Sequence, residues 1–227
     1  MIDAIITDIE GTTSSLSFVR DTLFPYARTH LPDFVKQHAE QADVKALLDS
    51  AATLCIPPVE GLDELIAVML EWIDQDQKYT PLKALQGLIW ADGYQRGAFQ
   101  GHIYPDACIA LKQWHDQGIR LYVYSSGSVA AQKLLFGHTL QGDMTGLFTG
   151  FFDTRVGAKK AVESYQTLVQ TLALPAERIL FLSDSEAELD AAHAAGLQTI
   201  ALARPGEGHG SKRHRSVSSF SAISKLI

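Results

Sequence analysis

Two carboxylates mark the first place in this chain where chemistry is expected, because Asp8 and Glu10 stand two residues apart. Gly11 and Thr12, both turn formers, follow at once. Carboxylates crowded into a turn repel each other unless a cation or a shared proton offsets their charge. A hard divalent ion such as Mg²⁺ takes oxygen ligands and keeps several of its waters. The pair therefore predicts a magnesium site, with a plain turn or helix-capping role for Asp8 as the alternative.

The same two carboxylates could share the steps of a phosphate ester hydrolysis. Asp8 could bind the ion with one oxygen and attack phosphorus with the other, which divides the reaction into two easier steps. Glu10 could protonate the leaving oxygen and later deprotonate the water that cleaves the aspartyl phosphate. The prediction is a phosphohydrolase that works through an aspartyl-phosphate intermediate.

Two serines after a later apolar run offer a place for the phosphate. Ser125 and Ser126 precede Gly127 at the mouth of an expected helix, where hydroxyls and backbone amides bind an oxyanion. A lysine is still needed to offset the charge of the transferring phosphoryl group. Lys159 and Lys160, at the start of another expected helix, are both candidates.

A further carboxylate pair follows a third apolar run. Asp184 stands directly after it and would add a metal oxygen from another strand end. Glu188, four residues on, could orient a metal-bound water. It could equally do no more than complement the dipole of its helix.

The elements that must position these residues alternate between apolar runs and helical periodicity. We expect strands over residues 2–7, 119–124, 178–182 and 198–202, and helices over 106–117, 159–172 and 187–195. This alternation predicts an α/β fold with a doubly wound parallel sheet. Because ligands bind at the carboxyl ends of parallel strands, the polar groups above should meet in one crevice.

The stretch from residue 18 to residue 100 has a different pattern. Segments 21–38, 63–77 and 80–99 space their apolar residues three to four apart and contain few β-branched runs. They predict an all-helical module inserted between the first and second strands.

Composition limits the class of protein. The chain has 227 residues, 46% of them hydrophobic and 20% charged, and a net charge of −7, so we expect a globular protein without a nucleic-acid partner. No apolar run approaches a membrane helix, and the N-terminal segment lacks the pattern of a signal peptide. Cys55 and Cys108 are expected to be free buried thiols. Together these features predict a cytoplasmic location.

The order of these motifs resembles the haloacid dehalogenase phosphatases. Residues 8–12 resemble their first motif, Ser125 the second, Lys159 the third and residues 183–188 the fourth. That superfamily usually has Asp two residues after the nucleophile, whereas this chain has Glu10. In this respect the chain is similar to the enolase-phosphatases of methionine salvage, a family whose pattern also matches residues 23–26, 85–90, 124–137, 152–154 and 164–165.

The resemblance implies a haloacid dehalogenase-like core over residues 1–15 and 101–227 with a helical cap over 16–100. It also implies a monomer that needs one Mg²⁺ and acts on a phosphorylated diketone, 2,3-diketo-5-methylthiopentyl-1-phosphate, which it enolises and then dephosphorylates. The metal ligands would be Asp8, Glu10 through its backbone carbonyl, and Asp184. The phosphate contacts would be Ser125, Ser126 and Lys159.

Two cap residues are candidates for recognising the methylthio end of that substrate. They are Gln86 and Trp90. The favoured alternative for Trp90 is that it packs in the core of the cap, since tryptophan buries a large apolar area.

Three other classes of protein share part of this pattern. Sugar phosphatases and phosphomutases of the superfamily are expected to carry Asp at the position of Glu10, and dehalogenases no carboxylate there. A receiver-like signalling module also places an Asp after a strand, but such modules are short and would not need a helical insertion that excludes water. Glu10 and the insertion favour the enolase-phosphatase interpretation.

Overall fold

The computed structural model describes residues 2–207 and 210–226 and divides the chain into two compact units. One unit comprises Met1–Leu16 together with Gln100–Ile227, and the other comprises Ser17–Phe99. The first is an α/β unit and the second is entirely helical among its described residues.

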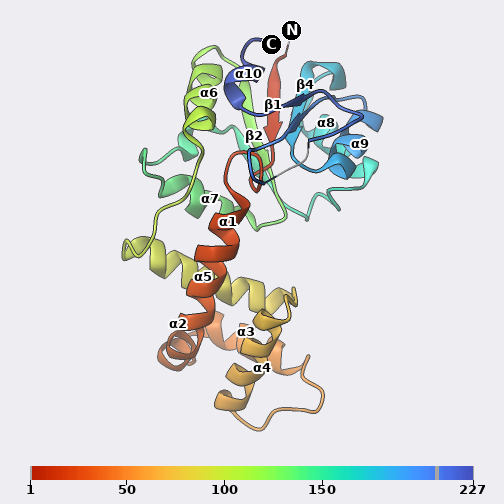
Figure 1. Ribbon diagram of the computed structural model, residues 1–227. Coiled ribbons are helices and arrows are strands. Elements are labelled where there is room, and N and C mark those ends of the chain that lie inside the picture. Colours follow the sequence, from red (N-terminus) through yellow and green to blue (C-terminus); the bar gives the residue numbers. More distant parts are fainter. Residues whose placement is uncertain (1, 208–209, 227) are drawn as a thin grey trace. The chain divides into compact units, whose positions relative to one another are not determined.

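The α/β unit is built on a six-stranded parallel sheet (Figure 1). Its order is β3-β2-β1-β4-β5-β6, with bounds β1 Ala4–Thr7, β2 Arg120–Tyr124, β3 Gly150–Phe152, β4 Ile179–Ser183, β5 Gln198–Leu202 and β6 Ser216–Val217. The chain moves outward from β1 to β3 and then returns to β4 on the other side of β1. This reversal creates a switch point at the carboxyl ends of the central strands, where open α/β sheets bind ligands. The predicted parallel sheet is confirmed, and the short strands β3 and β6 are additions to the prediction.

Helices cover both faces of this sheet. They are α6 (Pro105–Asp116), α7 (Val129–Gly137), α8 (Val162–Leu172), α9 (Glu186–Ala194) and α10 (Phe220–Ile223), with 3₁₀ turns at Thr145–Leu147 and Ala176–Arg178. Ala4 and Ile6 of β1 pack in one cluster with Tyr165, Leu168 and Leu189 of α8 and α9. Figure 1 shows α6 and α10 on the opposite side. All four residues of β1 are fully buried, which explains its continuous apolar run.

The helical unit contains four main helices. They are α2 (Phe24–His38), α3 (Ala42–Ala52), α4 (Leu62–Asp74) and α5 (Thr80–Gln95). The short helix α1 (Leu16–Phe18) and a π-helical turn at Val19–Leu23 precede them. Leu31 and Val35 of α2 pack with Leu85 and Ile89 of α5, and the four-residue spacing places each pair on one helix face. The predicted helical insertion is therefore present.

Three smaller predictions can be judged against the fold. Cys55 and Cys108 are both buried free thiols, as expected. Within the described part of the chain, no helix is both long enough and apolar enough to cross a membrane. The helix predicted to start at Lys159 starts instead at Val162. Lys159 lies in the preceding loop, where Gly157 has a φ of +146° that a helix cannot contain.

Candidate active site

The carboxyl ends of β1, β2 and β4 bring the predicted residues to one edge of the sheet. Thr7 is aligned with Val123 of β2 and with Leu182 of β4, so the polar residues that follow these strands leave the sheet at the same level. They surround a cavity of about 170 Å³. Its lining comprises Asp8, Glu10, Leu16, Ser125, Ser126, Lys159, Asp184 and Glu188. All six residues predicted from the sequence therefore share one site.

Asp8 is held in a fixed orientation at the end of β1. It is only 6% exposed, and its backbone N–H donates to Leu182 O at 2.9 Å. Its Oδ1 accepts from the N–H of Ile9 at 2.8 Å and lies 2.7 Å from the Lys159 ammonium. The second oxygen, Oδ2, lies 3.4 Å from the Ser183 hydroxyl. Oδ1 is thus held by two short contacts, whereas the contact of Oδ2 with Ser183 is long.

Lys159 is buried between two carboxylates. Its Nζ lies 2.7 Å from Asp8 Oδ1 and 2.7 Å from Glu188 Oε2. Burial alone would lower the pKa of Lys159, but the negative charges of Asp8 and Glu188 outweigh burial and raise it. The ammonium therefore keeps its charge at neutral pH. Lys160 is exposed, which resolves the choice between the two lysines in favour of Lys159 as the residue in the cavity.

Glu188 belongs to the same network. Its Oε2 accepts from the Ser183 hydroxyl at 3.0 Å as well as from Lys159, and the residue is 8% exposed. Burial, followed by the charge of Asp8, raises the pKa of Glu188, while the Lys159 ammonium opposes the rise. Dipole complementarity alone does not explain a carboxylate held inside the cavity by a lysine and a serine.

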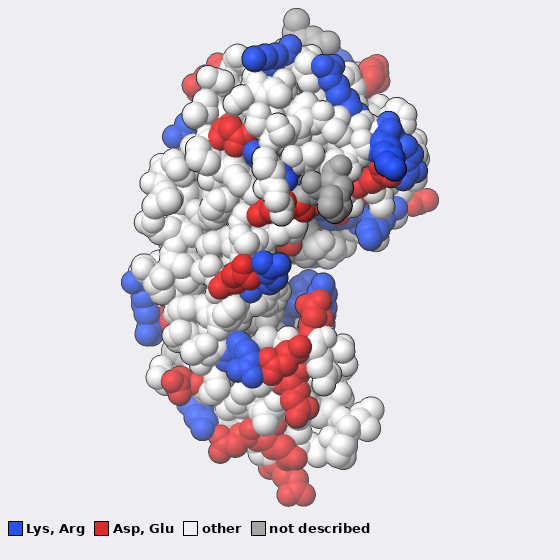
Figure 2. Space-filling view, in the orientation of Figure 1, with Lys and Arg blue, Asp and Glu red and all other residues white. Residues whose placement is uncertain are grey.

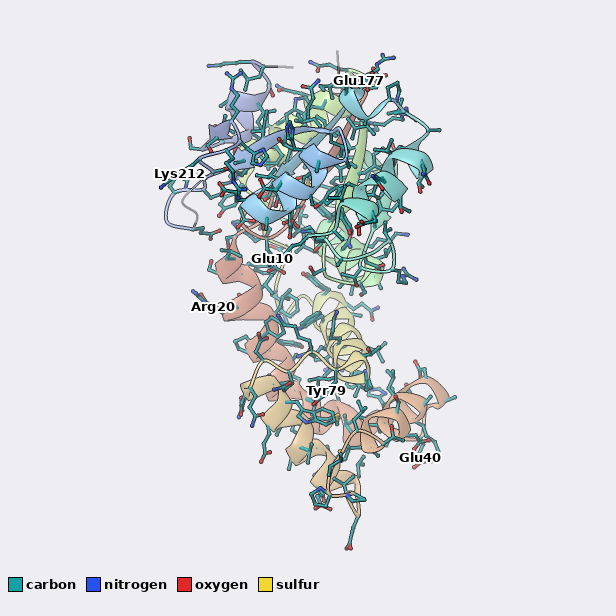
Figure 3. All side chains as sticks on the ribbon, turned by 90° about the vertical axis from the view of Figure 1, so that its right-hand side faces the viewer. Glu10, Arg20, Glu40, Tyr79, Glu177 and Lys212 are labelled. Atoms are coloured by element: carbon teal, nitrogen blue, oxygen red, sulfur yellow. The ribbon has the colours of Figure 1, made fainter. Side chains whose placement is uncertain are left out.

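Asp184 lies directly against the loop that carries Glu10. Gly11 has a φ of +66°, and a Cβ at this position would overlap the Asp184 carboxylate. Glycine is thus needed here both for its backbone conformation and for space. Burial, together with the charge of Asp8, raises the pKa of Asp184 to about 6. Glu10 is exposed on the loop after β1, as Figure 3 shows.

The donors in this cavity suit a hard divalent cation. Burial is the larger cause of the raised pKa of Asp184, and the charge of Asp8 adds to it. A cation between the two carboxylates would offset their repulsion. In the part of the chain that the structure describes, no three His, Cys, Asp or Glu side chains form a metal-binding group. The two carboxylates would therefore supply only part of the coordination of the ion. A backbone carbonyl, such as that of Glu10, and water molecules would supply the rest, and Mg²⁺ accepts such oxygen ligands.

Ser125 and Ser126 lie where the sheet meets α7. The backbone N–H of Ser125 donates to Phe152 O at 3.1 Å, and its hydroxyl accepts from the N–H of Gly127 at 3.3 Å. Ser128 caps α7 by accepting from the N–H of Ala131 at 3.2 Å. The two serines thus stand beside the N-terminal end of a helix, which favours an anionic group.

The two candidate specificity residues lie in the helical unit. Gln86 is buried in α5. Trp90 packs against the core of this unit, and its indole N–H donates to Leu23 O at 2.7 Å. The Trp90 indole therefore already has a structural partner, in agreement with the alternative that it belongs to the core.

One residue near the site escaped the sequence reasoning. Arg204 is 3% exposed, and its Nε donates to Thr12 O at 2.9 Å, while its Nη1 lies 2.8 Å from Asp106 Oδ2. It thereby fastens the loop that follows Asp8 and Glu10. A signal for it exists in the sequence, because Arg204 lies two residues beyond the end of β5 and polar residues near the ends of parallel strands gather at one edge of the sheet.

Comparisons with known proteins identify the family of the chain. A family model described as haloacid dehalogenase-like hydrolase matches residues 2–196. The protein named Enolase-phosphatase E1 from Methylococcus capsulatus is 56% identical over 223 residues, which cover 98% of this chain and 98% of that protein. The protein of the same name from Pseudomonas syringae pv. tomato is 55% identical over 222 residues, covering 98% and 97%.

A solved structure gives the same result for the fold. The crystal structure of the UTR4 protein from Saccharomyces cerevisiae matches with a TM-score of 0.83 and 33% identity, covering 96% of this chain and 98% of that chain. The family match extends over most of the chain, and the two bacterial relatives match along nearly their whole length. The chain therefore belongs to the haloacid dehalogenase-like hydrolase family.

Proposed function

We propose that this protein is a magnesium-dependent enolase-phosphatase that acts on 2,3-diketo-5-methylthiopentyl-1-phosphate. The observation that carries the proposal is the 55% identity, over 98% of this chain, to a protein named Enolase-phosphatase E1. The cavity supports it with a carboxylate pair, a buried lysine and two serines. On the face drawn in Figure 2, acidic and basic side chains are interspersed, which does not favour a nucleic-acid partner.

In the proposed reaction the diketone is first enolised and the phosphate is then transferred to the protein. One oxygen of the Asp8 carboxylate is the nucleophile and the other would hold the ion; Oδ1 is bound by Ile9 and Lys159, whereas Oδ2 has one contact of 3.4 Å with Ser183. The nucleophilic oxygen forms a bond to phosphorus as the bond from phosphorus to the leaving oxygen breaks. Glu10 donates its proton to that oxygen. Lys159, Ser125 and Ser126 hold the phosphoryl oxygens, and the lysine offsets their developing charge.

The second step regenerates the enzyme. Glu10, now ionised, takes a proton from a water molecule that attacks the phosphorus of the aspartyl phosphate, and Asp8 leaves as a carboxylate. Inorganic phosphate and the acireductone are the products. A bound Mg²⁺, held by Asp8, Asp184 and the Glu10 carbonyl, would neutralise charge on the phosphoryl group.

We further propose that the helical unit serves as the cap of the enzyme. Its insertion between β1 and β2 begins one residue after Leu16, which lines the cavity. A module at that place in the chain can exclude water during phosphoryl transfer. The protein is proposed to act as a monomer in the cytoplasm.

The experiment that tests this function offers the purified protein its proposed substrate. The diketo phosphate is incubated with Mg²⁺, the enediol product is followed by absorbance and phosphate release is measured in parallel. We expect both products to appear, with glucose 6-phosphate and fructose 6-phosphate as poor substrates. Equal turnover of the sugar phosphates would refute the proposed specificity, and no phosphate release from any of them would refute the phosphatase itself.

A further inference from the structure

The loop that carries Lys159 is tied down by three side-chain hydroxyls. The three consecutive carbonyls of residues 157–159 each accept a hydrogen bond from a different residue. The donors, in the same order, are Tyr124 at 3.0 Å, Ser164 at 2.8 Å and Tyr165 at 2.7 Å. Tyr124 ends β2, whereas the other two lie in the first turn of α8.

These bonds replace the ones that a helix or a sheet would supply. The loop lies outside both elements, and a buried carbonyl without a partner costs free energy. Tyr124 and Tyr165 are fully buried, and their ring centroids lie 5.7 Å apart in an edge-to-face arrangement. A Cβ at Gly157 would overlap the Ser164 hydroxyl, so the loop and α8 are in close contact.

Fixing this backbone determines where the lysine ammonium lies. Lysine has a flexible four-carbon side chain that loses rotamer entropy when it is ordered. Here the side chain starts from a backbone held on three carbonyls, and its Nζ lies 5.8 Å from the centroid of the Tyr124 ring and 2.7 Å from both Asp8 and Glu188. The position of the loop backbone therefore helps to set the distance from the ammonium to both carboxylates.

We infer that Tyr124, Ser164 and Tyr165 are positioning residues, which act on phosphate through Lys159 by holding the backbone from which it extends. The inference rests on the phosphate-binding role proposed for Lys159. It gives Ser164 and Tyr165 a function at the site, which their positions inside a helix do not suggest.

The test is a double-mutant cycle between Tyr165 and Lys159. Tyr165→Phe removes one hydroxyl and keeps the ring, and the affinity for inorganic phosphate is measured by calorimetry in the presence of Mg²⁺. We expect phosphate binding and the kcat/KM for p-nitrophenyl phosphate to fall about tenfold, the scale found for residues that orient site ligands. In a Lys159→Ala background the same substitution should change phosphate affinity by less than about twofold, because coupled residues are not additive.

Controls separate positioning from simple stability. Tyr122→Phe changes another buried tyrosine of β2, which stacks on Phe152, and should leave phosphate affinity unchanged. Ser164→Ala removes a second hydroxyl of the set and repeats the test if Tyr165→Phe does not fold. Unchanged phosphate affinity in the folded variant, or an equal loss with and without Lys159, would overturn the inference. Failure of the wild type on the diketo phosphate alone would refute only the proposed substrate, since the cycle uses other probes.

Discussion

Glu188 accepts a charge-assisted hydrogen bond from Lys159, with 2.7 Å between Oε2 and Nζ. Because the same ammonium lies 2.7 Å from Asp8, it is shared between two carboxylates on different elements. The Ser183 hydroxyl holds Glu188 from the other side at 3.0 Å. This arrangement fixes the direction of the lysine side chain as well as its charge.

Replacing Glu188 with glutamine should lower kcat/KM about 10- to 100-fold, because Lys159 would lose one of the two charges that orient it. Steady-state phosphate release measures the effect. Glu186→Gln is the matched control, since Glu186 lies on the same helix but binds Ser211 and Arg213 at the surface. The control should match wild type, and wild-type kcat/KM in Glu188→Gln would contradict the role of this pair.

Asp8→Asn should abolish phosphate release and leave the fold intact. Asparagine keeps nearly the same shape and can still accept from Ile9, but its amide is not a nucleophile toward phosphorus. Phosphate release and thermal unfolding should be measured together. Asp3→Asn, which alters an ion pair with Arg178 at the start of β1, controls for loss of a nearby carboxylate. Turnover of Asp8→Asn within tenfold of wild type would rule out the covalent mechanism.

Removal of divalent metal should stop the reaction, and Mg²⁺ should restore it. A ligand that binds only the folded protein also stabilises it, by about 3 kcal/mol at a hundredfold excess over its Kd. Mg²⁺ should therefore raise the Tm of the wild type and have little effect on Asp184→Asn. Full activity in excess chelator, or an equal Tm shift in the variant, would show that Asp184 does not hold the ion.

Much of this fold could be predicted because its signals are local. Strands β1 and β4 are fully buried and mostly apolar, and the helical insertion repeats its apolar residues at helical spacing. The sequence does not predict strands β3 and β6, because they have three and two residues, too few to show any periodicity. The sequence predicts too early a start for α8. The loop before this helix is held by Tyr124, 33 positions away from Gly157, and such a contact leaves no local pattern.

Most of the candidate site could also be predicted, because its signals are local as well. Each of the six predicted residues follows a strand or stands in a recognisable motif, and parallel strands end at one edge of the sheet. For Glu188, a helix-dipole role and a role at the site produce the same sequence signal. Only its contacts with Lys159 and Ser183 distinguish the two.

Arg204→Met should destabilise the protein strongly, because Asp106, which is partly buried, would lose the cation that it is paired with. Breaking a buried pair costs about 3–5 kcal/mol, whereas an exposed pair contributes about 1 kcal/mol or less. The side chain of Arg204 is 4% exposed in its pair, but that of Arg178 is 47% exposed in its pair with Asp3. Urea unfolding of Arg204→Met and Arg178→Met provides the comparison. Equal losses in the two variants would contradict a special contribution from Arg204.

Gly11→Ala should impair both stability and catalysis, and Gly97→Ala separates the two effects. Both glycines have left-handed backbones, with φ of +66° and +69°, so alanine at either position should cost roughly 1–2 kcal/mol. At Gly97 nothing lies within 4 Å of the added Cβ, whereas at Gly11 the Cβ would overlap the Asp184 carboxylate. We therefore expect the Tm to fall in both variants, while the Mg²⁺ concentration needed for half-maximal phosphate release rises only in Gly11→Ala. A normal Mg²⁺ requirement in that variant would show that Asp184 can move aside without loss, and would contradict the close fit between the two residues.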